Sequence, residues 1–204
     1  MERVECKNWA KDSRKKHQWD VFKAVFLTAV ISGAMEGVTS QISNKVLALL
    51  LDIVAVLVTF VLGIGLTKFM IAIKDDKKAN ISDLFFYFSN SFKNVLITGL
   101  YQTVMILLHT LLLIVPGIIK AFSYALVPYL LVDNPDKNYK EICDLSQKMM
   151  DGHKMDYFVL NLSFIGWHIL GSLTLGILEI WILPYQQLAI TKFLCEVKDN
   201  YKEK

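Results

Sequence analysis

The chain has 204 residues, of which 54% are hydrophobic and 20% are charged, and its mean hydropathy is +0.41. This composition excludes a disordered or solvating protein. The net charge of +3 is small and the basic residues are dispersed along the chain, so no nucleic acid partner is expected.

Long uncharged runs predict an all-α integral membrane protein with six transmembrane helices. Pro116-Gly117 and Gly176 interrupt the two longest runs, so each run is interpreted as two helices joined by a tight turn. At about 1.5 Å per residue, the helices reach most or all of a ~30 Å hydrocarbon core. The predicted helices, which form three hairpins, are 20–38, 46–73, 94–115, 117–132, 156–175 and 177–197.

The distribution of Lys and Arg predicts which side of the membrane each connection faces. Segments 1–23, 68–93, 137–154 and 192–204 hold 20 of the 22 basic residues, whereas only Lys45 and Lys120 lie elsewhere. Because basic residues collect in cytoplasmic loops, we expect both termini in the cytoplasm. A soluble helical bundle is one alternative to a membrane protein, but it would not need basic and uncharged connections to alternate along the chain. A secretory signal peptide is the other alternative for the N-terminal segment, since Arg14, Lys15 and Lys16 precede an apolar stretch.

The cysteine content agrees with this topology. Cys6, Cys143 and Cys195 all fall on the predicted cytoplasmic side, where thiols stay reduced. No disulfide is therefore expected.

Short matches predict that the chain is one membrane domain, 1–204, built from three approximate repeats, 1–73, 74–132 and 133–204. His17, Asp20 and Phe22 have the same spacing as His153, Asp156 and Phe158, each set at the entry to a helical pair. The exits match as well, at Thr67-Lys68 and Thr191-Lys192. Each unit is interpreted as a cytoplasmic amphipathic helix followed by a membrane hairpin.

The amphipathic segments are clearest in the second and third units. Asn138 is a helix cap with Glu141 three residues later, and Gly152 is a stop signal. Apolar residues then line one face of each helix. These faces are Ile142, Leu145 and Met149 in the third unit and Ile81, Leu84, Phe85, Phe88 and Phe92 in the second.

Ionisable residues within the predicted helices suggest a ligand site. Under the predicted topology they lie in the outer half of the membrane, where charges are costly unless they face one another, water or headgroups. The hypothesis is an outward-facing polar cavity in which the histidines accept protons or bind a headgroup, Lys120 contacts an anion and the carboxylates are partners. The alternative is that each group snorkels to the surface. The candidate ligand-binding residues are Asp52, His109, Lys120, His168 and Glu179.

The sequence lacks the common motifs for catalysis, metal binding and cofactor binding. The sequence has no His-Glu-x-x-His, no Cys-x-x-Cys, no phosphate-binding Gly-rich loop with Lys and no Gly-x-Ser-x-Gly. No catalytic residue, metal or cofactor is therefore predicted. Membrane lipids are the expected partners, together with a membrane protein partner or a second copy of the chain.

The second half of the chain contains a set of short motifs: Pro116 to Lys120 with Tyr124, Asp133 to Pro135, Met150 to Lys154, Leu162 to Trp167, Leu173-Thr174 and Leu183 to Tyr185. These motifs resemble those of a bacterial integral membrane family called domain of unknown function 975. The resemblance is densest over 116–197, and Lys16 to Trp19 extends it to an N-terminal element that lacks the family's Gly-Asn. It implies a multi-pass protein of the bacterial plasma membrane and brings no established activity or catalytic residues. The chain is also similar, more distantly, to the membrane domains of some glycerophosphodiester phosphodiesterases.

Three functions remain open. The first is a non-enzymatic protein that binds or transports an amphiphile or small solute through the bundle. The second is an assembly or regulatory subunit that acts through its cytoplasmic amphipathic helices. The third is an intramembrane enzyme that modifies lipid, using His109 or His168 with a carboxylate.

Overall fold

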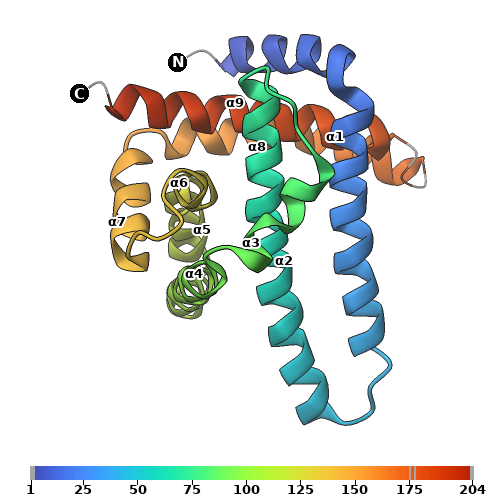
Figure 1. Ribbon diagram of the computed structural model, residues 1–204, viewed down its shortest axis with the longest axis vertical. Coiled ribbons are helices and arrows are strands. Elements are labelled where there is room, and N and C mark those ends of the chain that lie inside the picture. The colour runs from blue at the N-terminus through green and yellow to red at the C-terminus, as the bar shows by residue number, and fades with distance from the viewer. Residues whose placement is uncertain (1–2, 175, 177, 203–204) are drawn as a thin grey trace.

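The computed structural model describes residues 3–174, 176 and 178–202, and these residues form helices and no strand (Figure 1). This confirms the all-α prediction for the described part of the chain. The helices are α1 (Arg3–Thr39), α2 (Lys45–Lys74), η1 (Ile81–Phe85), α3 (Phe86–Ser89), α4 (Phe92–Leu112), α5 (Ile114–Ser123), α6 (Val127–Asp133), α7 (Tyr139–Met149), α8 (Lys154–Leu173) and α9 (Glu179–Lys202).

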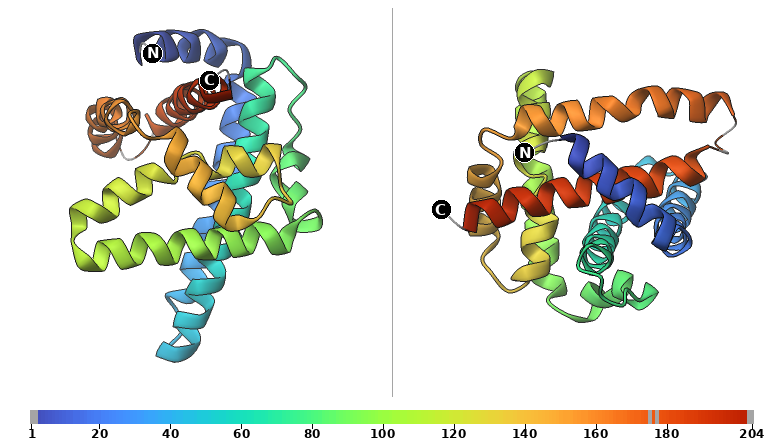
Figure 2. Two further views of the ribbon diagram at one scale, coloured as in Figure 1. Left: turned by 90° about the vertical axis from the view of Figure 1, so that its left-hand side faces the viewer. Right: turned by 90° about the horizontal axis from the view of Figure 1, so that it is seen from above.

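The first hairpin consists of α1 and α2, which run antiparallel and project beyond the rest of the molecule (Figure 1). Asn44 begins α2 as its N-cap, and its side-chain oxygen accepts hydrogen bonds from the backbone nitrogens of Val46, at 3.0 Å, and Leu47, at 3.2 Å. α1 is continuous from the basic N-terminal segment into the predicted span. Its N-terminal part nevertheless bends away from the hairpin and lies beside α9 (Figures 1 and 2).

The second hairpin turns earlier than the sequence predicted. α4 ends at Leu112, and Leu113 adopts an extended backbone with φ −161° and ψ 145°. Pro116 and Gly117 therefore lie inside α5 and do not form the turn. Proline fits the first turn of a helix, where its missing N–H costs nothing, so Pro116 helps to begin α5. Gly117 lets the two helices approach, since a Cβ there would come within 2.8 Å of the Thr110 Cα.

The third unit agrees with its predicted local signals. Asn138 caps α7, accepting a hydrogen bond from the Lys140 nitrogen at 2.9 Å, and α7 buries Ile142 and Met149. Pro184 lies inside α9, as predicted. Residues 175 and 177, where the predicted spans 156–175 and 177–197 end and begin, lie outside the described residues. In the second unit the predicted amphipathic face is divided between η1, α3 and α4, and it buries Leu84 but leaves Phe85 exposed.

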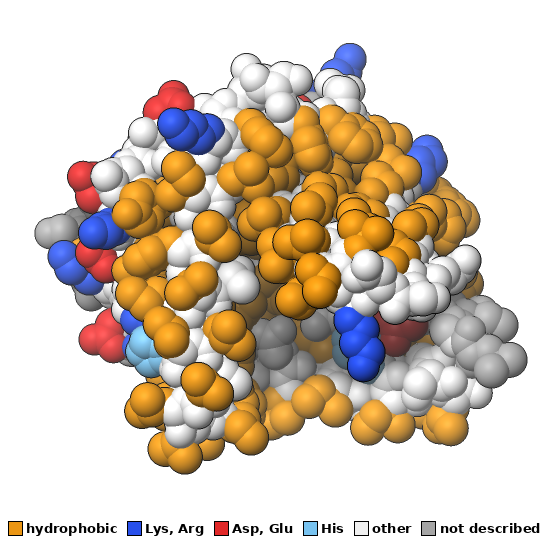
Figure 3. All heavy atoms as spheres, turned by 90° about the horizontal axis from the view of Figure 1, so that it is seen from below, with side chains coloured by type: hydrophobic (Ala, Val, Ile, Leu, Met, Phe, Trp, Pro, Cys, Tyr) orange, Lys and Arg blue, Asp and Glu red, His pale blue; other side chains and the backbone are white. Residues whose placement is uncertain are grey.

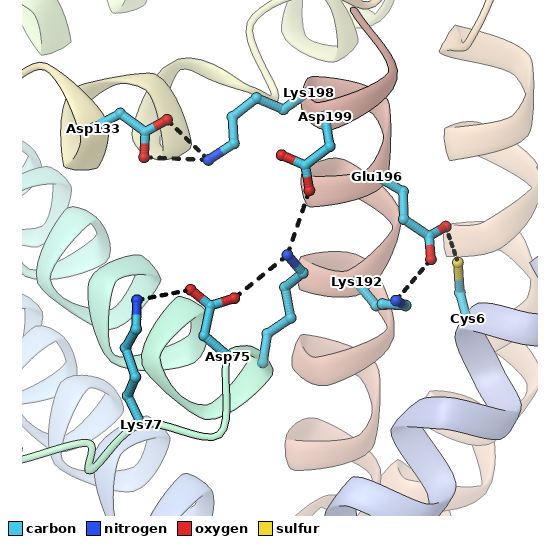
Figure 4. A network of polar contacts seen from close by, with 9 residues as sticks. Cys6, Asp75, Lys77, Asp133, Lys192, Glu196, Lys198 and Asp199 are labelled. Atoms are coloured by element: carbon cyan, nitrogen blue, oxygen red, sulfur yellow. Dashed lines mark hydrogen bonds and ion pairs between the residues drawn. The ribbon is translucent and has the colours of Figure 1, made fainter. Parts of the chain in front are cut away.

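The hydrophobic core joins the bases of the three hairpins. Its largest buried side chains include Tyr87 of α3, Tyr124 after α5, Phe69 of α2, Phe164 of α8 and Phe193 of α9. Ion pairs surround this core and connect α9 to its neighbours (Figure 4). Lys198 contacts Asp133 of α6 at 3.0 Å, and Lys74 of α2 contacts Asp199 at 3.5 Å.

The hairpin tips, in contrast, expose large hydrophobic side chains. Seen from the side of the α1–α2 turn, most of the visible side chains are hydrophobic (Figure 3). Soluble proteins do not leave patches of this extent open to water. The exposed residues include Leu49, Leu50 and Val54 of the first hairpin, Leu111, Leu112 and Ile114 of the second, and Ile165, Trp167 and Leu173 of the third.

Among the described residues, four helical segments are long and apolar enough to cross a membrane: Val4–Thr39, Lys45–Lys74, Phe92–Leu112 and Ile114–Asp133. The protein is thus a membrane protein by the length and composition of its helices. α8 and α9 are not among the four, so the prediction of six spans is supported for only the first two hairpins. The charged residues of α9 include Glu179, Lys192, Glu196, Lys198 and Asp199.

The hairpins also run in different directions. In Figure 1, α1 and α2 stand upright, α4 to α6 are seen end-on, and α8 and α9 lie crosswise. The view from above shows the same crossing, with α9 running across the ends of α1 and α2 and α8 lying on one side of α9 (Figure 2). The three hairpins are therefore not parallel to one another.

Candidate ligand-binding site

A chain of polar contacts links α8 and α9. The His168 ring on α8 faces two residues of α9, with Nδ1 at 3.0 Å from Glu179 Oε1 and Nε2 at 2.7 Å from Gln186 Oε1. Glu179 and Gln186 are seven residues apart and so share one face of their helix. Because both partners are oxygen acceptors, this arrangement favours a ring that donates from both nitrogens.

A glycine makes room for this contact. A Cβ added to Gly171 would lie 2.5 Å from Glu179 Oε1, which is closer than real Cβ atoms come to an oxygen. The small residue on α8 therefore allows the carboxylate to lie against the helix within reach of His168.

A pocket of about 310 Å³ lies between α9 and the N-terminal part of α1, next to Trp167 at the end of α8. Two of its walls are basic, because α1 contributes Lys11 and Arg14. The guanidinium carbon of Arg14 lies 5.8 Å from the centre of the Tyr185 ring. Within the described part of the chain, the buried Nε of Arg14 has no hydrogen-bond partner. The full lining is Lys11, Arg14, Trp167, Leu178, Trp181, Ile182 and Tyr185.

Contacts further along α9 hold the N-terminal part of α1 in place. The Cys6 thiol donates to Glu196 Oε2 at 3.6 Å, and Glu196 also pairs with Lys192 at 2.9 Å (Figure 4). The Lys192 ammonium lies 5.6 Å from the centre of the Trp9 ring. These contacts place the two basic residues of the pocket against the aromatic residues of α9.

An apolar pocket of about 360 Å³ lies on the neighbouring face of α9. α1 contributes Phe22 and Phe26, and α9 contributes Ile180 and Leu183. Glu179, the partner of His168, also borders this pocket. The same two helices thus form one pocket with cationic walls and another that is almost entirely apolar.

The other three candidate residues lie on the first two hairpins. Asp52 is exposed on α2, near the tip of the first hairpin. His109 donates from Nδ1 to the Met105 carbonyl of its own helix at 2.7 Å. Lys120 donates to Gln147 Oε1 of α7 at 2.6 Å.

Of the five candidates, the structure therefore joins only His168 and Glu179 in a direct contact. Sequence reasoning missed Gln186, Lys11 and Arg14. The seven-residue spacing of Glu179 and Gln186 on one helix was a usable signal for the first. No local signal placed the N-terminal segment on α9, because that packing is a long-range contact.

The cysteines and possible metal ligands complete the chemistry of the described residues. Cys6, Cys143 and Cys195 are free and buried. Burial raises the pKa of the Cys143 thiol on α7 to about 12, so this thiol stays protonated at neutral pH. No group of three or more His, Cys, Asp or Glu side chains suited to a metal ion occurs within the described ranges.

A family model described as "Protein of unknown function (DUF975)" matches residues 95–201, slightly more than half of the chain. The match covers α5 to α8, most of α4 and nearly all of α9. No curated protein and no solved structure matches the chain.

Proposed function

We propose that this chain, which belongs to the DUF975 family of proteins of unknown function, is a non-enzymatic membrane protein that binds an anionic amphiphile between α1, α8 and α9. The headgroup occupies the pocket of Lys11 and Arg14, and an acyl chain occupies the apolar pocket beside Phe22 and Phe26. This proposal keeps His168 and Glu179 of the sequence-based site and adds the basic residues of α1.

The observation that carries the proposal is the pocket with two cations and three aromatic side chains. Arg14 has an unpartnered buried nitrogen, and guanidinium groups bind phosphate and carboxylate oxygens through charge-assisted hydrogen bonds. Trp167 and Trp181 are of the type that gathers at the headgroup level of membranes. The combination matches an anionic headgroup with an apolar tail.

The geometry also bears on where the site faces. Lys11 and Arg14 belong to the basic N-terminal segment, which we place in the cytoplasm because basic residues collect there. α9 packs against this segment, so we place the α8–α9 hairpin along the cytoplasmic surface of the bacterial plasma membrane. The site then opens to the cytoplasmic leaflet, opposite to the outward-facing cavity that the sequence suggested.

Binding is favoured over catalysis by the state of His168. Both ring nitrogens already have oxygen partners, at 3.0 Å and 2.7 Å, so neither is free to remove a proton from a substrate. The pair instead fixes the position of Glu179 between the two helices. His168, one of the two histidines that an intramembrane enzyme could use as a base, is thus held in a structural contact.

The proposal is tested with purified protein in vesicles of phosphatidylcholine that contain brominated phosphatidylglycerol, which quenches nearby tryptophans. In a background with Trp9→Phe and Trp19→Phe, quenching measures how strongly Trp167 and Trp181 select the anionic lipid. A hydrogen bond to a charged group contributes about 1.5–3 kcal/mol, so Arg14→Gln and Lys11→Gln should each weaken the apparent affinity by about tenfold or more.

The matched control is Lys15→Gln, which removes the same charge from the adjacent position. Lys15 is outside the pocket and pairs with Asp12 at 3.6 Å on an exposed face. Its replacement should change the affinity by less than about twofold. An equal loss in Lys15→Gln, or equal quenching by brominated phosphatidylcholine, would show general electrostatic attraction and reject the site.

A further inference from the structure

A separate pocket of about 290 Å³ lies where the second hairpin meets α8. It shares no residue with the pockets on α9. Its walls come from α4, α5, the turn after α5, α6 and α8, so it joins the second and third units of the chain. The lining is Gln102, Ala121, Phe122, Tyr124, Ala125, Pro128, Tyr157 and Asn161.

Two buried polar atoms of this pocket have no hydrogen-bond partner in the described structure: the Gln102 side-chain oxygen and the Tyr124 hydroxyl. Tyr124 is 1% exposed. A buried polar atom without a partner is costly, and such atoms are rare in native proteins. The amide oxygen needs a donor, whereas the phenol both donates and accepts. A ligand with a hydroxyl group can donate a hydrogen bond to the Gln102 oxygen and accept one from the Tyr124 hydroxyl.

The ligand that fits these walls is neutral. None of the described residues that line the pocket is charged. The nearest cation, Lys120, lies 5.1 Å from the centre of the Tyr124 ring, but its ammonium donates to Gln147 Oε1 at 2.6 Å. An ionised headgroup would therefore be desolvated here without an available opposite charge, which is strongly unfavourable.

The pocket also has an apolar approach from the hairpin tips. Phe122 and Tyr157 form one wall, with their ring centres 5.5 Å apart in an edge-to-face contact. Ile118 lies one turn from Phe122 on α5 and is 47% exposed, and Ile165 lies one turn from Asn161 on α8 and is 50% exposed. Residues four apart share a helix face, so these apolar side chains extend the pocket wall toward the tips.

We infer that this pocket binds a neutral lipid with a free hydroxyl, and that diacylglycerol is the occupant. Its hydroxyl donates to the Gln102 oxygen, and its hydroxyl or ester oxygens accept from Tyr124. Its acyl chains pass over Ile118 and Ile165 into the hydrocarbon of the bilayer. The pocket gives the protein a second lipid site whose selectivity depends on hydrogen bonding and is independent of the basic pocket on α9.

The test uses the full chain in phosphatidylcholine nanodiscs and a diacylglycerol with a photoactivatable diazirine in one acyl chain. Illumination should crosslink the probe to peptides that contain Ile118 or Ile165. Unlabelled diacylglycerol should compete, whereas the same lipid with its hydroxyl methylated should compete at least about fivefold less well, since one hydrogen bond is lost. Equal competition by the methylated lipid would overturn the inference.

Two variants remove the hydrogen-bonding groups while keeping the shape of the pocket. Tyr124→Phe and Gln102→Met should each reduce probe affinity by about fivefold. The matched control, Tyr139→Phe, makes the same change on α7 outside the pocket and should leave affinity unchanged. Because Tyr124→Phe removes a buried hydroxyl that lacks a partner, its Tm without added lipid should equal or exceed that of the wild type.

Three results would contradict the inference: no crosslinking of the wild type, equal crosslinking of all variants, or a loss in Tyr139→Phe as large as in Tyr124→Phe. A pocket that holds only water would give the first result. Arg14→Gln should leave the crosslinking unchanged, so the failure of one lipid site is distinguishable from the failure of the other.

Discussion

The first and third hairpins share a core but differ along their exposed lengths. α1 and α2 are among the candidate spans of the described residues, whereas α8 and α9 are not and carry the His168, Glu179 and Gln186 contacts between them. Both hairpins expose large hydrophobic side chains at their tips. The comparison teaches that two hairpins with similar apolar tips differ in the polar contacts between their helices.

The bases of the two hairpins should be energetically alike. Phe69 of α2 and Phe193 of α9 are both fully buried in the shared core. Replacing either with Ala leaves a cavity and should lower the free energy of unfolding by about 3–5 kcal/mol. Denaturant or thermal unfolding in detergent measures this loss. The control, Leu111→Ala at a tip where the side chain is 83% exposed, should cost under about 0.5 kcal/mol, and an equal cost there would disprove the division into bases and tips.

A charge placed in each hairpin should separate their positions in the membrane. Val54 and Ile165 are both about half-exposed and apolar. Val54→Lys should oppose insertion by about 2.5–3.5 kcal/mol, because it lies within a span. On our proposal that α8 lies along the membrane surface, Ile165→Lys should oppose insertion less than Val54→Lys, because a lysine there can extend its ammonium to the interface. Resistance of the protein to alkaline extraction from membranes reports the difference. An equal loss of resistance to extraction in the two variants would support the prediction of six spans.

Two glycines of α8 should respond differently to the same substitution. A Cβ at Gly171 would press on the Glu179 carboxylate, whereas a Cβ at Gly166 meets no atom within 4 Å. Gly171→Ala gains the same helix propensity but displaces the carboxylate from His168, so it should be about 1 kcal/mol less favourable than Gly166→Ala. Gly166→Ala should stabilise the hairpin by up to about 1 kcal/mol, since Ala favours helix. In a double-mutant cycle measured by thermal unfolding, Glu179→Ala should cancel the cost at Gly171, and strict additivity would argue against the contact.

The smallest effect concerns the open end of the first hairpin, where Lys16 of α1 contacts Asp76 at 2.9 Å. The hydrogen bond and charge of Lys16 lower the pKa of Asp76. A lowered carboxyl pKa gives stability that is present above the unfolded value of about 3.9 and is lost as the pH falls through the folded value. Asp76→Asn should therefore lower Tm slightly near pH 7.

At about pH 3 and below, the Tm difference between Asp76→Asn and the wild type should shrink toward zero. Asn tolerates the left-handed backbone at this position, where φ is 52°, so the variant isolates the charge. The pair is exposed, and a Tm difference that persisted unchanged at low pH would show that the charge is not its source.

Much of the local structure was predictable because it depends on residues close in sequence. Asn138 as a cap, the α7 face and Pro184 within α9 are local signals. The turn at Leu113 was misplaced because proline either breaks a helix or begins one, depending on its position in the first turn. For the candidate site, charge patterns identified His168 and Glu179 but not Arg14 of the neighbouring pocket, since Arg14 is more than 150 residues away from both.

The sequence by itself determined that this is an all-α membrane protein, because apolar runs and the spacing of Lys and Arg are set by the bilayer and by local backbone geometry. Only the tertiary structure decided which hairpins run together, because packing between distant helices depends on the shape of side chains across the core. It therefore also decided that the basic N-terminal segment lies on α9 and that His168 is held between Glu179 and Gln186.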